Sequence, residues 1–173
     1  MKVNKPWEYY YTDNFLPEDQ YNSLLDQCKS LFKDSTKDVD RYILDHDPTP
    51  QIKNYMNYFN EKRGYYNLAK FIHLTSTKAN FVHPMHVDSE FKIMSAVLYL
   101  GEDNNGTRIY AEKDGEVVAE VDWKPNRLFA FCGKDDVTWH DYTSKGQRFT
   151  YNYFIVDPSK IENPEYKSGL VKF

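Results

Sequence analysis

Residues 148–156 read RFTYNYFIV, a stretch in which polar and apolar side chains alternate over most of the length. Successive side chains of a β-strand point to opposite faces, so Arg148, Thr150 and Asn152 would share one face, with Phe149 and Tyr151 on the other. We therefore expect a strand with one apolar face in a core. The opposite face would need a ligand, because a buried guanidinium is costly unless it is paired.

Outward from this stretch, the period of two recurs over most of the preceding 90 residues, and turn residues such as the Asp114-Gly115 pair separate the segments. A series of about eight short strands with tight turns is typical of a sandwich or jelly roll. The expected strands are residues 68–75, 81–87, 93–100, 107–111, 117–121, 127–132, 138–142 and 148–156.

The sequence before these strands has helical spacing instead. Apolar residues from Tyr21 to Phe32 recur at i, i+3, i+4 and i+7, which predicts a helix over residues 17–33 that begins at Pro17. A second helix is expected over residues 50–63, with Thr49 as N-cap and Gly64 just past its end. Helices followed by a strand-rich region indicate the α+β class.

One domain is expected over residues 1–173, because neither a repeat nor a low-complexity linker divides the chain. Its expected parts are a helical N-terminal part with helices packed on one sheet (residues 15–64), a jelly-roll core (residues 68–156) and an irregular C-terminal tail (residues 157–173).

Composition narrows the classes of function. The net charge is −4 and the charges are scattered, which disfavours nucleic acid as a partner. No apolar run approaches the roughly 20 residues of a membrane-spanning helix, and the first ten residues contain no secretory signal, so we expect a cytoplasmic protein with no membrane partner. Cys28 and Cys132 form no CxxC pattern. Nothing in the sequence indicates the oligomeric state.

Two histidines and one aspartate are candidate metal ligands. His86-Val87-Asp88 is an H-x-D element whose two side chains would share one face of a strand, and His140 follows 52 residues after Asp88. Two imidazoles and one carboxylate leave coordination positions open, as in non-haem Fe(II) oxygenases, whereas a closed zinc site needs a fourth protein ligand. The alternative is that these are hydrogen-bonded histidines of the core.

These elements also carry a family resemblance. His86-Val87-Asp88 is followed in order by SAVLYL (95–100), NGT (105–107), PNRLFAF (125–131), Trp139-His140 and Arg148-Phe149-Thr150, and it is preceded by DNFLPE (13–18). In order and spacing, the chain resembles the Fe(II)/2-oxoglutarate-dependent dioxygenases over roughly residues 8–156, and most of all their prolyl 4-hydroxylase-like branch.

The resemblance implies a double-stranded β-helix with His86, Asp88 and His140 as catalytic iron ligands. Arg148 would bind the distal carboxylate of 2-oxoglutarate with help from Thr150, and Tyr99 is a candidate, by position, for contact with the proximal carboxylate. Two departures stand out. Collagen-type members have a lysine where Arg148 stands, and residues 75–80 lack the usual tyrosine-containing strand.

The implied activity is hydroxylation of a C–H bond, with a prolyl residue of a peptide or protein favoured as substrate and with release of succinate and CO2. The implied partners are Fe(II), 2-oxoglutarate and dioxygen, with ascorbate as a candidate reductant. Asp88 favours hydroxylation over halogenation, since related halogenases lack this carboxylate. Candidate substrate contacts are residues 41–47, 78–84 and 90–92.

Other functions stay open at this point. The chain could be a non-catalytic jelly-roll binding module, a metal site without turnover, a cupin-like enzyme that uses no oxoacid, or a dioxygenase that acts on a free amino acid or another small molecule. An inward Arg148 beside the H-x-D element would favour the dioxygenase over a binding module, because a plain binding module gives no reason for it.

Overall fold

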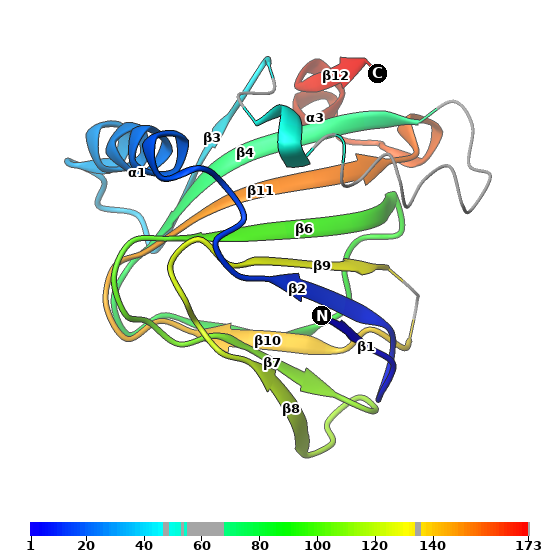
Figure 1. Ribbon diagram of the computed structural model, residues 1–173. Coiled ribbons are helices and arrows are strands. Elements are labelled where there is room, and N and C mark those ends of the chain that lie inside the picture. Colours follow the sequence, from blue (N-terminus) through cyan, green and yellow to red (C-terminus); the bar gives the residue numbers. More distant parts are fainter. Residues whose placement is uncertain (47–48, 53, 55–67, 134–135, 173) are drawn as a thin grey trace.

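The computed structural model describes residues 1–46, 49–52, 54, 68–133 and 136–172. Two antiparallel sheets face each other, and the long helix α1 (Glu18–Phe32) lies against the outer side of the larger sheet (Figure 1). The expected combination of an N-terminal helix with a two-sheet β region is therefore confirmed, with α1 within one residue of its predicted ends.

The larger sheet has eight strands, and β11 lies near its middle, between β6 and β4. Its strand order is β1-β2-β9-β6-β11-β4-β12, and β3 also pairs with β4. The strands are β1 (Lys2–Val3), β2 (Tyr9–Thr12), β3 (Val39–Ile43), β4 (Ala69–Thr77), β6 (Lys92–Leu100), β9 (Leu128–Cys132), β11 (Arg148–Val156) and β12 (Leu170–Lys172).

The smaller sheet has four strands in the order β5-β10-β7-β8. They are β5 (Val82–His86), β7 (Thr107–Tyr110), β8 (Val117–Val121) and β10 (His140–Thr143). The expected strand over 138–142 therefore begins at His140 instead, and the expected strand over 81–87 ends at His86. Asp88 consequently lies two residues beyond the end of β5.

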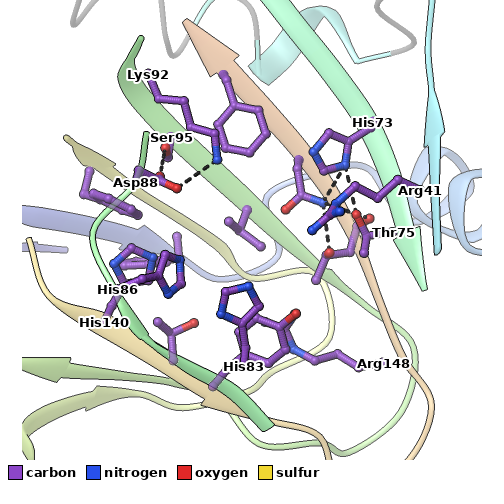
Figure 2. Close-up of a pocket in the computed structure, with 18 residues that line it drawn as sticks. Arg41, His73, Thr75, His83, His86, Asp88, Lys92, Ser95, His140 and Arg148 are labelled. Carbon is purple, nitrogen blue, oxygen red and sulfur yellow. Dashed lines mark hydrogen bonds and ion pairs between the residues drawn. The ribbon is translucent and has the colours of Figure 1, made fainter. Parts of the chain in front are cut away.

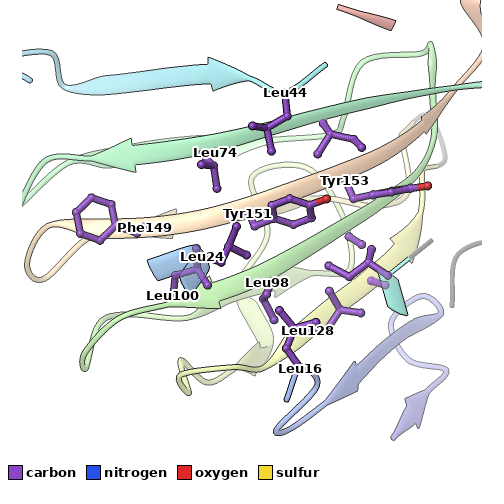
Figure 3. Packing of buried hydrophobic residues seen from close by; sticks show 14 of the residues in the cluster. Leu16, Leu24, Leu44, Leu74, Leu98, Leu100, Leu128, Phe149, Tyr151 and Tyr153 are labelled. Carbon is purple, nitrogen blue, oxygen red and sulfur yellow. The ribbon is translucent and has the colours of Figure 1, made fainter. Parts of the chain in front are cut away.

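The main hydrophobic core lies between α1 and the outer face of the larger sheet (Figure 3). Leu74 of β4, Tyr151 of β11 and Leu98 of β6 form one row across three paired strands, and each is fully buried. Leu24 and Cys28 of α1 belong to the same cluster. Burial of one such leucine stabilises the fold by about 1.5–3 kcal/mol, so this cluster fixes which face of the larger sheet packs against α1.

Three parts of the chain differ from the sequence-based expectation. Residues 39–43, assigned to the helical part, form β3 as an edge strand on β4, and residues 9–12 form β2 on β9. The tail is not irregular, because it contains a 3-10 turn η1 (Pro158–Lys160), helix α3 (Pro164–Ser168) and β12, which pairs with β4. An apolar cluster that contains Phe71, Ile161 and Leu170 explains why this segment folds back.

The second expected helix is only partly described. Residues 50–52 are helical, and the backbone N–H of Ile52 donates to the Thr49 carbonyl at 2.9 Å, consistent with a helix start at Thr49. Residues 53 and 55–64 of this expected helix lie outside the described residues. No helix in the described ranges has the length and apolar character that a membrane span requires.

Candidate active site

A pocket opens between the two sheets, on the face of β4 and β11 opposite the main core (Figure 2). It contains about 670 Å³ of space outside the protein atoms, part of it open solvent. The larger sheet contributes polar side chains in register across paired strands: Arg148 opposite Thr77, Thr150 opposite Thr75, and Asn152 opposite His73. The smaller sheet contributes His86 and His140.

His86 and His140 lie opposite each other on the paired strands β5 and β10, with ring centroids 4.4 Å apart. Nδ1 of His86 lies 2.9 Å from the carbonyl oxygen of Pro84, and Nδ1 of His140 lies 2.8 Å from that of Thr138. A carbonyl oxygen only accepts, so each Nδ1 carries the proton and each Nε2 keeps a lone pair for a metal. Burial lowers the pKa of both rings, which favours this neutral form.

The carboxylate of Asp88 is held by two neighbours. Lys92 donates to its Oδ1 at 2.8 Å, and the Ser95 hydroxyl donates to its Oδ2. Burial alone would raise the pKa of Asp88, but the charge and hydrogen bond of Lys92, with the hydrogen bond of Ser95, hold it below its usual value. The group is therefore an anion, and its oxygens keep further lone pairs for a cation.

The three side chains converge. One ligand atom from each of His86, Asp88 and His140 lies within 4.8 Å of the others. Two imidazole nitrogens and one carboxylate oxygen suit ferrous iron with open coordination positions. Because the proton of each ring is on Nδ1, the Nε2 lone pair is the one available to bind the metal. The residues present therefore fit the metal that the sequence analysis implied.

Arg148 begins β11 and is 4% exposed. Its Cζ lies 4.0, 5.0 and 5.5 Å from the ring centroids of Tyr142, Trp123 and Tyr99, and no hydrogen bond to its buried Nε is found within the described part of the chain. No described carboxylate acts on its charge, and burial lowers the pKa of its guanidinium. A planar cation in an aromatic box, with a buried donor left over, is a fitting receptor for a carboxylate.

Thr150 and Tyr99 differ in their relation to the pocket. Thr150 lines it, and its Oγ1 accepts from Nδ2 of Asn152 at 3.0 Å. Tyr99 is not among the lining residues: its ring stacks on Trp123 at 4.4 Å, and its hydroxyl hydrogen-bonds with Thr107 at 2.7 Å. Tyr99 thus lies behind the Arg148 guanidinium, away from the pocket. Its hydrogen-bond partner Thr107 lines the pocket instead.

The segments 41–47, 78–84 and 90–92, expected to contact the substrate, contribute Arg41, His83 and Lys92 to the pocket, whereas sequence reasoning missed His73 and Ser95. His83 packs its ring between His86, at 4.3 Å, and Tyr142, at 5.0 Å. Lys92 and Ser95, which hold Asp88, follow it by four and seven residues across the turn into β6. A signal existed for His73, because His73 and Thr75 alternate with the apolar residues Ile72 and Leu74 in β4, as polar and apolar residues do over 148–152 in β11.

The fold is shared with solved structures. A viral collagen prolyl hydroxylase from Paramecium bursaria Chlorella virus-1, in a 2-oxoglutarate complex, matches with a TM-score of 0.65 at 14% identity over 86% of this chain and 94% of that one. A Pseudomonas putida prolyl 4-hydroxylase matches with a TM-score of 0.60 at 17% identity, over 86% of this chain and 91% of that one. A Trichoplax adhaerens prolyl hydroxylase, bound to a hypoxia-inducible factor peptide, matches with a TM-score of 0.65 at 11% identity, over 87% of this chain and 84% of that one.

The chain has the jelly-roll fold of prolyl hydroxylases. The predicted double-stranded β-helix is thereby confirmed. No family model and no curated protein sequence matches the chain. At 11–17% sequence identity these structures show a common fold, while the chemistry depends on the residues of the pocket.

Proposed function

We propose that the protein is an Fe(II)- and 2-oxoglutarate-dependent dioxygenase that hydroxylates a C–H bond. The observation that carries the proposal is the presence, in one pocket, of a converging His86, Asp88 and His140 set and a buried Arg148 whose Nε lacks a partner within the described residues. A non-catalytic binding module accounts for either feature alone but gives no reason for both.

Each residue has a defined role in this proposal. His86 and His140 bind the iron through Nε2, and Asp88 binds it through a carboxylate oxygen while Lys92 and Ser95 fix the orientation of that group. Arg148 binds the distal carboxylate of 2-oxoglutarate in the aromatic box, and Thr150 adds a hydroxyl on the same side of β11.

Bound Fe(II) and 2-oxoglutarate, together with dioxygen, would supply oxidative decarboxylation, in which one oxygen atom enters succinate, released with CO2, and the other is transferred to the substrate. The chain contributes by holding the metal, the co-substrate and the substrate in position and by excluding water. The rings of Phe129, Phe131 and Phe154 line the pocket beside the polar groups and keep the surroundings apolar.

A prolyl residue in a peptide or protein is the first substrate to test. The support for this choice is that the structural neighbours include a collagen prolyl hydroxylase and a prolyl hydroxylase in complex with a peptide. A free amino acid is the alternative substrate to test.

Succinate formation from 2-oxoglutarate tests the proposal. We expect formation that requires Fe(II) and is reduced at least a hundredfold, on the order expected when a metal ligand is removed, in His86→Ala. His46→Ala is the matched control, because His46 is exposed and, although it belongs to the segment 41–47 expected to contact the substrate, it is not among the described residues that line the pocket. Succinate formation without Fe(II), or equal formation in His86→Ala, would overturn the proposal. Prolyl peptides that gain one oxygen atom would identify the substrate.

A further inference from the structure

The pocket is positively charged although the chain carries a net charge of −4. Three basic side chains line it, Arg41, Lys92 and Arg148, whereas Asp88 is the only acidic side chain among its described lining residues. Lys92 already pairs with Asp88, and the proposed function assigns Arg148 to the distal carboxylate of 2-oxoglutarate. Arg41 is the basic side chain left without a role.

Arg41 reaches the pocket from the edge strand β3. It lies opposite Thr75 in the β3–β4 register, and Thr75 in turn lies opposite Thr150 in the β4–β11 register. Thr150, Thr75 and Arg41 therefore form one row across three strands on the pocket face. Figure 2 shows Arg41 beside His73 and Thr75, across the pocket from Asp88, His86 and His140. No described carboxylate pairs with the Arg41 guanidinium, and Asp40 is occupied by Ser35 and Lys37.

His73 adds a neutral hydrogen-bond donor next to Arg41. Asn152 donates through Nδ2 to Oγ1 of Thr75 at 3.0 Å, which leaves the Thr75 hydroxyl to donate to Nδ1 of His73 at 2.9 Å. The proton of the neutral imidazole is then on Nε2. Burial, reinforced by the charges of Lys92 and Arg41, lowers the pKa of His73 to about 3, so the ring is a donor and not a cation.

A second cavity adjoins the pocket at these residues. Six residues line both cavities: Arg41, His73, His83, His86, Asp88 and Lys92. The aromatic side chains of Phe71, Phe91 and Tyr166 line only the second, so a molecule that occupies both cavities contacts the Arg41 guanidinium and an aromatic wall.

We propose that Arg41 binds a carboxylate of the primary substrate, with His73 beside it, so that the substrate is an organic acid or an acidic peptide. The inference rests on the proposed function, since it assigns Arg148 and the metal ligands to the co-substrate. Two sources share this chemistry: the α-carboxylate of a free amino acid, and the side-chain carboxylate of an acidic residue next to a peptidyl proline.

Pairs of probes that differ only in this charge test the inference. N-acetyl-L-proline is compared with its amide, and the dipeptide amide acetyl-Pro-Asp-NH2 with acetyl-Pro-Asn-NH2, by calorimetric titration into the full chain loaded with Mn(II) and 2-oxoglutarate without dioxygen. We expect at least one acid to bind about three- to tenfold more tightly than its amide, because exposed charge pairs contribute modestly. The pair that shows the preference identifies the source of the carboxylate.

Arg41→Gln should abolish this preference, and Arg41→Lys should retain part of it. The affinity for 2-oxoglutarate should stay within about twofold of wild type in Arg41→Gln, whereas Arg148→Met should weaken it. The inference is wrong if no acid is preferred over its amide, if the preference survives in Arg41→Gln, or if Arg41→Gln weakens 2-oxoglutarate binding as Arg148→Met does. Absence of any Mn(II)-dependent 2-oxoglutarate binding in wild type would instead overturn the proposed function.

Discussion

The two faces of β4 and β11 are equally buried and chemically opposite. Both strands are buried along their full nine residues. On one face, Leu74 and Tyr151 pack into the main core beneath α1. On the other face, Thr75 and Thr150 lie opposite each other and face the smaller sheet, with Arg148 two residues along β11 on the same side.

The difference shows that burial alone does not distinguish a core from a site. The apolar face is satisfied by contacts within the protein, because dispersion and the hydrophobic effect need no specific partner. The polar face leaves the buried Nε of Arg148 without a partner among the described residues, and its other polar side chains hydrogen-bond with one another within and between β4 and β11. We therefore expect substitutions on the first face to affect folding and those on the second to affect binding.

The largest loss of stability is expected from a substitution on the core face. Leu98→Ala, which removes a fully buried side chain in the row of Leu74 and Tyr151, should lower the free energy of unfolding by about 2–5 kcal/mol. The dissociation constant of 2-oxoglutarate for the Mn(II)-loaded protein should change less than about threefold, because the side chain lies on the opposite face. Urea unfolding and calorimetry measure the two quantities. A large loss of affinity in the folded variant would mean that the two faces are not separable.

Arg148→Met should show the reverse pattern. The concentration of 2-oxoglutarate needed for half-maximal succinate formation should rise about ten- to hundredfold, because a desolvated charge pair is lost. The free energy of unfolding should stay the same or increase, since an apolar side chain of similar length replaces a buried charge without a described carboxylate partner. An unchanged requirement for 2-oxoglutarate would remove Arg148 from the binding site.

The smallest effect is expected from the pH dependence of His73. Burial lowers the pKa of this ring to about 3, whereas in the unfolded chain it is about 6.5. Below pH 6.5 the unfolded chain takes up a proton that the folded chain does not, so the stability from His73 is present above that pH and is lost as the pH falls toward 3. Wild type should therefore lose about 1 kcal/mol relative to His73→Gln between pH 6.5 and 5.5.

Urea unfolding of both chains at the two pH values, with a chelator present, measures this difference. The other histidines are common to both chains, so their contributions cancel. His46→Gln, an exposed substitution, is the control and should follow wild type. A constant difference between wild type and His73→Gln would show that the ring is not held neutral by the fold.

The sequence predicted the strand that separates the two faces. The alternation over residues 148–156 gave the bounds of β11 and the inward position of Arg148, because the period of two directly encodes which side chains share a face. The ordered motifs likewise brought His86, Asp88 and His140 together in one hypothesis, and their ligand atoms converge in the structure.

The rest depends on pairings that a single sequence does not encode. The segment 41–47 was expected to contact the substrate, but strand β3 was not expected, because five residues are too short for their alternation to stand out, and its register with Thr75 is what brings Arg41 to the pocket. Position alone makes Tyr99 a candidate contact of the proximal carboxylate. In the structure its ring stacks on Trp123, a residue from a separate part of the chain, and lies behind Arg148. The folded tail depends in the same way on long-range contact with β4.

The short strands that flank the larger sheet limit how a peptide could approach. β1 has two residues and β12 has three, so in the described ranges these two strands present little free backbone for an incoming strand. Recognition by strand addition is thus disfavoured at both places. The five-residue edge strand β3, which pairs only with β4 among the described strands, offers more backbone, and an extended ligand added there would lie beside Arg41 and the pocket.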